Sequence, residues 1–151
     1  MSSRLPDTSA RRARENLAIL LREPFRAMDD LLIRRLAERG HAEVRSAHGA
    51  VFQYLDDAGT RAGVLAERAG VTKQSMAELI AHLERHGYVE RVPDPADGRA
   101  KLVRATAKGA EVYAIARETM AEIEARLEAR LGARRMATLR ELLEEIGEEL
   151  G

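Results

Sequence analysis

Apolar residues recur along most of the chain at the three- and four-residue spacing of amphipathic helices. The first stripe crosses the segment 11–39 and predicts a long helix that Gly40 ends. Pro24 interrupts this stripe, so the segment forms either one kinked helix or two helices, the second with Pro24 in its first turn. We favour the single kinked helix. The residues that form this stripe are Leu17, Leu20, Leu21, Phe25, Met28, Leu32 and Leu36.

Shorter stripes follow at 48–55 and 62–69, and Gly70 supplies a left-handed residue that commonly ends a helix. Thr72 then stands where a helix N-cap is needed, ahead of a helix that stops at Gly87. Strand-forming residues at 88–92 and 99–104 flank a turn over 93–98 that is rich in proline and glycine, which predicts a hairpin. Two further stripes predict a helix that Thr106 caps and that ends near Leu131, and a last helix after Gly132.

Composition adds a constraint on charge. The 151 residues include 25 basic and 25 acidic side chains and no cysteine. The neutral total is a cancellation: residues 1–45 carry a net charge of +3, 46–105 are neutral, and 106–151 carry −3. Without cysteine there is no disulfide, thiolate ligand or thiol redox chemistry. The segment 1–10 predicts a flexible leader, and no segment has the length or the signal features that would place the chain in or across a membrane, so we expect a cytoplasmic protein.

A short helix, a glycine turn, a second helix and a hairpin form the order of a winged helix-turn-helix, whose second helix enters the DNA major groove. The residues Thr72, Lys73, Gln74 and Ser75 open that second helix with four polar, non-acidic side chains, and His82 flanks its outward face. Gln and Lys can bind base edges, and free N–H groups at a helix start can bind phosphate. An ordinary capped helix start would look similar.

The hairpin tip offers a second candidate contact. Arg99 follows the tip, Lys101 shares its strand face, and Asp97 is near enough in sequence to orient the arginine. An arginine on a narrow hairpin can enter an A·T-rich minor groove, where the negative potential is concentrated. The alternative is an exposed ion pair of no consequence. We therefore predict DNA contacts from Thr72, Lys73, Gln74, Ser75, His82, Asp97, Arg99 and Lys101.

Several blocks of the sequence resemble the MarR family of bacterial transcription regulators: LAERAGVTKQS at 65–75, LERHGYVER at 83–91, PDPADGRAKLV at 93–103 and TAKG at 106–109. The resemblance covers roughly residues 44–115. It implies a mainly α-helical fold with a two-stranded β-wing, in which a winged domain at 46–105 lies between dimerisation helices at 11–45 and 106–151. It also implies a homodimer that binds a palindromic operator in double-stranded DNA.

The same resemblance implies a small-molecule effector site between the dimer region and the DNA-binding domain, often for phenolic or other aromatic compounds. Candidate lining residues are Met28, Leu32, His48, Phe52 and Tyr113, although an ordinary hydrophobic core would explain them equally well. Two departures from the family pattern bear on DNA binding. Gly98 stands where relatives often have a charged residue, and Glu78 places a carboxylate on the groove-facing side of the second helix, where phosphate would repel it.

Other chemistries have weaker support. His82 and His86 are four residues apart on one helix, but no acid or cysteine at a suitable spacing completes a metal site. The sequence has no nucleophile elbow, phosphate-binding glycine loop or zinc-protease motif, so we expect neither an enzyme nor a cofactor. We predict a dimeric, sequence-specific DNA-binding regulator, a repressor released by a small ligand. The alternative is a protein-interaction or assembly module that uses the winged fold without DNA.

Overall fold

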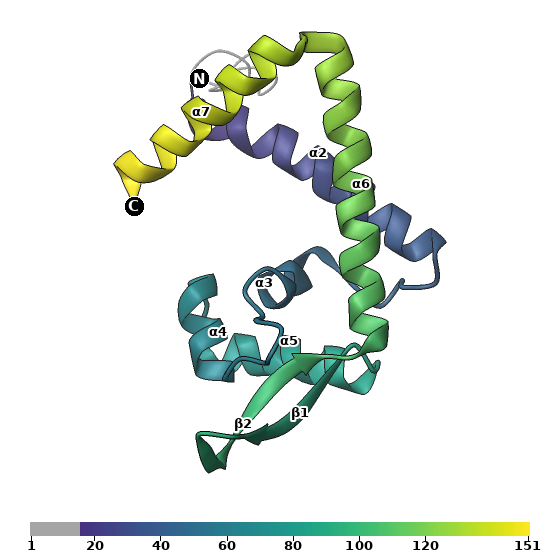
Figure 1. Ribbon diagram of the computed structural model, residues 1–151, viewed down its shortest axis with the longest axis vertical. Coiled ribbons are helices and arrows are strands. Elements are labelled where there is room, and N and C mark those ends of the chain that lie inside the picture. Colours follow the sequence, from purple (N-terminus) through teal and green to yellow (C-terminus); the bar gives the residue numbers. More distant parts are fainter. Residues whose placement is uncertain (1–15) are drawn as a thin grey trace, which may run out of the picture.

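The computed structural model describes residues 16–151, so the predicted leader at 1–10 and the predicted start of the first helix at 11–15 lie outside the described residues. The fold is mainly α-helical with one two-stranded antiparallel sheet, as predicted. Figure 1 shows the winged domain at one end, the long helix α6 rising from it, and α7 folding back at the other end. The elements are α2 (Leu17–Glu38), η1 (Ser46–His48), α3 (Gly49–Phe52), α4 (Ala62–Ala69), α5 (Lys73–Arg85), β1 (Val89–Asp94), β2 (Asp97–Ala105), α6 (Ala107–Leu131) and α7 (Ala133–Leu150).

The hydrophobic core lies inside the winged domain and extends to the place where α2 crosses α6. Its fully buried members come from α2, α3, α4, α5, β1, β2 and the turn before β1, so even the short helices of the winged domain contribute to one shared core. Burying each of these side chains stabilises the fold by about 1.5–3 kcal/mol. The largest are Leu36, Val51, Leu65, Met76, Ile80, Leu83, Tyr88, Val89 and Val103.

The turn between α4 and α5 has the predicted chemistry. Gly70 adopts the left-handed conformation (φ 65°), and the Val71 N–H donates to the Ala66 carbonyl, which closes α4. Thr72 then caps α5, because its hydroxyl accepts the Ser75 N–H at 3.0 Å. The turn sets the direction of α5, and the buried face of α5 fixes which of its side chains point outward.

The wing is longer and its turn tighter than predicted. We expected strands at 88–92 and 99–104 with a six-residue turn, whereas β1 and β2 continue until Asp94 pairs with Asp97. The cause is Asp94, a buried carboxylate whose Oδ1 accepts the Ala96 N–H at 2.9 Å and whose Oδ2 is bound by Arg61. At the other edge of β2, Thr60 and Val103 exchange two backbone hydrogen bonds, so β2 is flanked on both sides near its base.

The first helix runs through Pro24 as one element, which agrees with the single helix that we favoured. Asn16 caps it by accepting the Ala18 N–H at 2.9 Å, so the helix starts at Leu17. Its N-terminal half is not buried within the chain: Phe25 is 69% exposed and Leu17 57%. The last helix behaves similarly, with Met136 buried and four leucines exposed, namely Leu139, Leu142, Leu143 and Leu150.

Among the described residues, no helix combines the length and the apolar character that crossing a bilayer requires.

Candidate nucleic-acid interface

The N-terminal turn of α5 carries the predicted recognition residues, and all four are exposed. Thr72 and Ser75 are partly committed to the cap, because their hydroxyl oxygens are hydrogen-bonded to each other at 2.8 Å. Lys73 and Gln74 form no side-chain hydrogen bond or ion pair within the described part of the chain, so their polar ends are free for a ligand. The polar groups without a partner at this helix start are therefore those of Lys73 and Gln74, while Thr72 and Ser75 take part in the cap.

An open groove of about 520 Å³ runs between η1 and the outward side of α5. Two arginines stand at this groove, Arg85 near the C-terminal end of α5 and Arg45 just ahead of η1, and Glu78 lies in it with them. Arg45 was not among the predicted residues. No sequence signal marks it, since its position next to α5 depends on how the chain folds between 41 and 52. These two cations offset the carboxylate of Glu78 at the same surface.

His82, predicted as a DNA contact, is half-buried and lines the groove between η1 and α5. Its Nε2 donates to the Glu43 carbonyl at 2.8 Å, and its ring stacks on His48 with centroids 4.4 Å apart and planes 18° from parallel. His48 is buried, and its Nδ1 accepts the Arg45 N–H at 2.9 Å. Burial, then the neighbouring His82, lowers the pKa of His48 to about 4. The pair therefore attaches α5 to η1. His82 shares the groove with the predicted Ser75, whereas Lys73 and Gln74 do not line it.

The wing presents Asp97, Arg99 and Lys101 on its exposed surface. Asp97 orients the backbone here, not the guanidinium: its Oδ1 accepts the Arg99 N–H at 3.1 Å. The Arg99 side chain has no ion-pair partner within residues 16–151. The expected pairing of Asp97 with the Arg99 guanidinium is therefore absent from the structure, because a carboxylate two residues away reaches the backbone N–H more readily than the long side chain.

Arg61, which precedes α4 and contacts the wing, was not among the predicted residues. Its Nε and a terminal nitrogen bind the Asp94 carboxylate at 2.8 and 2.6 Å, and that terminal nitrogen lies 4.0 Å from Asp97. The Ala96 N–H and then this guanidinium hold the pKa of Asp94 below its usual range. Arg61 is the N-cap residue of α4, so this contact ties the wing tip to the first helix of the helix-turn-helix.

A buried hydrogen-bond network joins the winged domain to α6. The fully buried Tyr88 donates its hydroxyl to Glu43 at 3.1 Å and lies 3.1 Å from His41 Nδ1, and His41 Nε2 is 3.3 Å from Glu111. Burial and the bond to Glu43 raise the pKa of Tyr88 to about 12. Lys108 adds a bond to the His86 carbonyl at 2.8 Å and lies over the Tyr88 ring. The C-terminal end of α5 is therefore fixed relative to α6.

The predicted effector site corresponds only in part to a cavity. Leu32, Phe52 and Tyr113 line a cavity of about 80 Å³ between α2, α3 and α6, whereas Met28 and His48 do not. Tyr113 closes one side: its hydroxyl donates to the Phe52 carbonyl at 2.6 Å, and burial raises its pKa to about 12. A cavity that holds benzene measures about 150 Å³, so this one must widen to admit an aromatic ring.

The described residues contain no group of three or more histidine, cysteine, aspartate or glutamate side chains that could hold a metal ion.

A helix-turn-helix followed directly by a hairpin wing defines the class of winged-helix proteins. The MarR family model matches residues 45–100. The chain is 43% identical over 60 residues to an HTH-type transcriptional regulator of Mycobacterium tuberculosis and 41% identical over 61 residues to the transcriptional regulator HosA of Escherichia coli O111:H-. Each match covers 40% of the chain and spans less than half of the relative, 42% and 45% respectively.

Solved structures agree with the fold over most of the chain. The reduced form of MarR from E. coli superposes with a TM-score of 0.72 at 25% identity, covering 87% of the chain and 96% of MarR. The PcaV regulator of Streptomyces coelicolor, solved in complex with its natural ligand, gives 0.62 at 26% identity, covering 92% and 99%. Residues 45–100 therefore match the MarR family model, and the fold over most of the chain is that of MarR-type transcription regulators.

Proposed function

We propose that this protein is a dimeric, sequence-specific DNA-binding regulator that represses its target genes and is released from DNA by a small molecule. The observation that carries the proposal is the exposed N-terminal turn of α5, where Lys73 and Gln74 have free polar ends on a rigidly capped helix. The wing adds Arg99, also without a partner among the described residues. These groups suit base edges and phosphates in the major and minor grooves.

The charge of the winged domain predicts how strongly it binds arbitrary DNA and how that affinity depends on salt. Residues 61–104 carry eight basic and six acidic side chains, an excess of two per subunit. Few phosphates are then neutralised, so affinity for arbitrary DNA is low and depends weakly on salt concentration. Arg85, one of these eight, and Arg45, which lies outside the range, stand beside α5 and offset Glu78. Such a protein acts in the compartment that holds the DNA, the bacterial cytoplasm.

The dimer is supported by the apolar surface that the chain leaves uncovered. The leucines of α7 and the N-terminal half of α2 expose more apolar surface than an isolated subunit would keep in water. We assign residues 11–45 and 106–151 to the dimerisation region and 46–105 to DNA binding. A two-fold dimer would set two copies of α5 about 34 Å apart, one turn of a palindromic operator.

Release by a small molecule is supported by the cavity beside Tyr113. Its walls come from α2 and α6 on one side and from η1 and α3 on the other, so a molecule that widens it would move the winged domain relative to the dimerisation helices. If the small molecule binds the displaced arrangement of the winged domains more tightly than the DNA-binding arrangement, it shifts the dimer towards a spacing of the two α5 helices that does not fit DNA.

The experiment is a competition assay with DNA from the region flanking the protein's own gene, measured by fluorescence anisotropy. Gln74→Ala should relax the preference at one base pair per half-site by about 1–3 kcal/mol, because a bidentate contact to adenine is lost. Gln53→Ala, which removes an exposed glutamine outside the interface, should leave binding unchanged. Absence of any DNA complex at low salt would instead favour a protein-interaction module with the winged fold.

A further inference from the structure

Of the described residues that line the groove between η1 and the outward side of α5, Glu78 alone is acidic. It is exposed, and it lies one turn after Gln74 on α5, about 40° around the helix from it. The buried face of α5, formed by Met76, Ile80 and Leu83, is on the opposite side of the helix. Glu78 and Gln74 therefore share the outward surface of α5, which is the surface that a recognition helix turns towards the base pairs.

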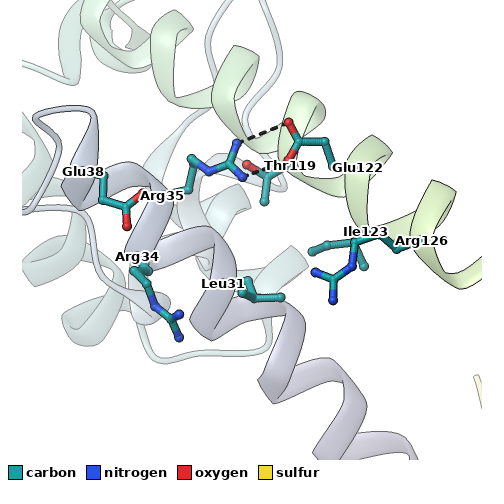
Figure 2. Close-up of a pocket in the computed structure, with 8 residues that line it drawn as sticks. All are labelled: Leu31, Arg34, Arg35, Glu38, Thr119, Glu122, Ile123 and Arg126. Atoms are coloured by element: carbon teal, nitrogen blue, oxygen red, sulfur yellow. Dashed lines mark hydrogen bonds and ion pairs between the residues drawn. The ribbon is translucent and has the colours of Figure 1, made fainter.

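The carboxylate of Glu78 has no partner among the described residues. It forms no ion pair or hydrogen bond there, although Arg45 and Arg85 line the same groove. Elsewhere the chain pairs such groups directly: where α2 crosses α6, Glu122 accepts both terminal nitrogens of Arg35, at 2.8 and 3.3 Å, as Figure 2 shows. Within residues 16–151 the two groove arginines likewise form no ion pair. The groove therefore offers a carboxylate with free oxygens, beside two guanidinium groups that are available to phosphate.

The two arginines also offset the repulsion that a carboxylate meets on a surface facing DNA. A glutamate beside the phosphates weakens binding to DNA of every sequence, because the backbone charge does not depend on sequence. Apart from the histidines, the groove carries two guanidinium groups against one carboxylate, an excess of one positive charge. His48 adds no charge at neutral pH, because burial lowers its pKa to about 4. The surroundings of Glu78 therefore attract the DNA backbone despite its own charge.

We propose that Glu78 is a specificity-determining residue that accepts a hydrogen bond from the N4 amino group of cytosine, and this rests on the proposed DNA-binding function. An ionised carboxylate accepts hydrogen bonds and donates none. In the major groove guanine presents two acceptors, thymine an acceptor and a methyl group, and adenine a donor beside an acceptor, whereas cytosine presents a donor alone. Because Glu78 lies about 6 Å along α5 from Gln74, the bases that the two residues read lie within about two base pairs of each other.

The test is selection of bound duplexes from a random DNA library by the full-length protein, followed by sequencing. The unaltered protein should enrich cytosine at one position in each half-site, within about two base pairs of the position whose preference Gln74→Ala relaxes. Glu78→Ala should lose the enrichment at the cytosine position alone. Glu78→Gln should move it from cytosine to adenine, since an amide offers both a donor and an acceptor. Both variants should keep the fold, because Glu78 is exposed and holds no other described residue in place.

Anisotropy titrations with the selected duplex measure the size of the effect. Replacing the cytosine by thymine, or by N4-methylcytosine, whose methyl group takes the place of the major-groove N–H, should weaken binding of the unaltered protein about tenfold or more, because a charge-assisted hydrogen bond is lost. Glu78→Ala should bind all three duplexes equally. Glu67→Ala is the matched control, since it removes the same charge from an exposed position of α4 outside the groove, and it should show the full preference.

Two results would overturn the proposal while leaving DNA binding in place. Base preferences in Glu78→Ala that equal those of the unaltered protein, with affinity raised for every sequence, would show that Glu78 only repels phosphate. Enrichment of guanine or thymine at the position that Glu78→Ala alters would exclude a hydrogen bond to cytosine. Failure of the unaltered protein to enrich any sequence would instead refute the proposed function, and the role of Glu78 with it.

Discussion

Gly109, near the start of α6, marks a close approach of this helix to the base of the wing. A Cβ at this position would overlap the Tyr88 carbonyl oxygen and lie 3.2 Å from the Ala105 Cβ. Neither neighbour is a flexible side-chain end, so in Gly109→Ala the helix must move away from the wing by on the order of 1 Å. The Tyr88 carbonyl also accepts the Thr106 N–H at 3.0 Å, and the movement of the helix would strain this hydrogen bond.

The magnitude follows from these contacts. Overpacking costs about 1–3 kcal/mol, and weakening the Thr106 bond costs about 1 kcal/mol more. The higher helix propensity of alanine returns about 1 kcal/mol. We therefore expect Gly109→Ala to lower the free energy of unfolding by about 1–3 kcal/mol. The helix α6 sets the position of the winged domain relative to the dimerisation helices. The DNA affinity of Gly109→Ala should therefore fall as well, even at temperatures where the variant is fully folded.

Gly63→Ala is the matched control, since Gly63 lies in helix α4 and an added Cβ meets no atom within 4 Å. It should leave the protein as stable as before or stabilise it by up to about 1 kcal/mol. The assay is urea unfolding followed by circular dichroism at one fixed protein concentration, so that dimerisation affects all variants equally. Equal unfolding midpoints for the two alanine variants would refute the argument that Gly109 permits the close approach.

Three further predictions concern the dimer, acid stability and the wing. Phe25 is 69% exposed, which for an aromatic side chain leaves about 100–170 Å² uncovered. Burying that area is worth roughly 2.5–4 kcal/mol, of which only part appears as affinity, so Phe25→Ala should weaken dimerisation at least about tenfold by analytical ultracentrifugation. Phe25→Leu should retain most of the dimer affinity. An unchanged dimer in Phe25→Ala would exclude this surface from the dimer interface. His48 has a pKa of about 4 when folded against 6.5 when unfolded, so the unfolded state takes up the proton first and stability should fall as pH drops from 6.5 towards 4. His48→Gln, which keeps an acceptor for the Arg45 N–H, should flatten that fall in urea titrations at several pH values, and an identical slope would remove His48 as its source. Arg99→Ala should weaken binding to all DNA sequences, whereas Arg117→Ala should not; unchanged affinity for Arg99→Ala would leave the wing without a role.

Local sequence signals predicted the helix-turn-helix because each of its features depends on neighbouring residues. Gly70 ends α4, Thr72 caps α5, and the buried spacing of Met76, Ile80 and Leu83 orients the helix. The order of elements, and with it the winged class, followed from such signals alone. Their physical basis is the backbone geometry of one or two turns, which distant residues do not alter.

Contacts between distant residues were not predictable in the same way. The wing turn is tight because Arg61 binds Asp94, thirty-three positions later, and no periodicity connects the two. The position of the His82 ring depends on the Glu43 carbonyl and on the His48 ring, which only the completed fold brings together. The apolar stripes of α2 and α7 were recognised as helical, but a stripe does not tell whether it packs inside the subunit or against another one.

The central claim is that α5 and the wing read DNA, and competition binding to a labelled fragment from beside the protein's own gene tests it most directly. We predict a complex that unlabelled fragment displaces at far lower concentration than unrelated DNA of equal length, and whose affinity falls only shallowly with salt because few phosphates are neutralised. Equal displacement by both competitors, or no complex even at low salt, would contradict the account.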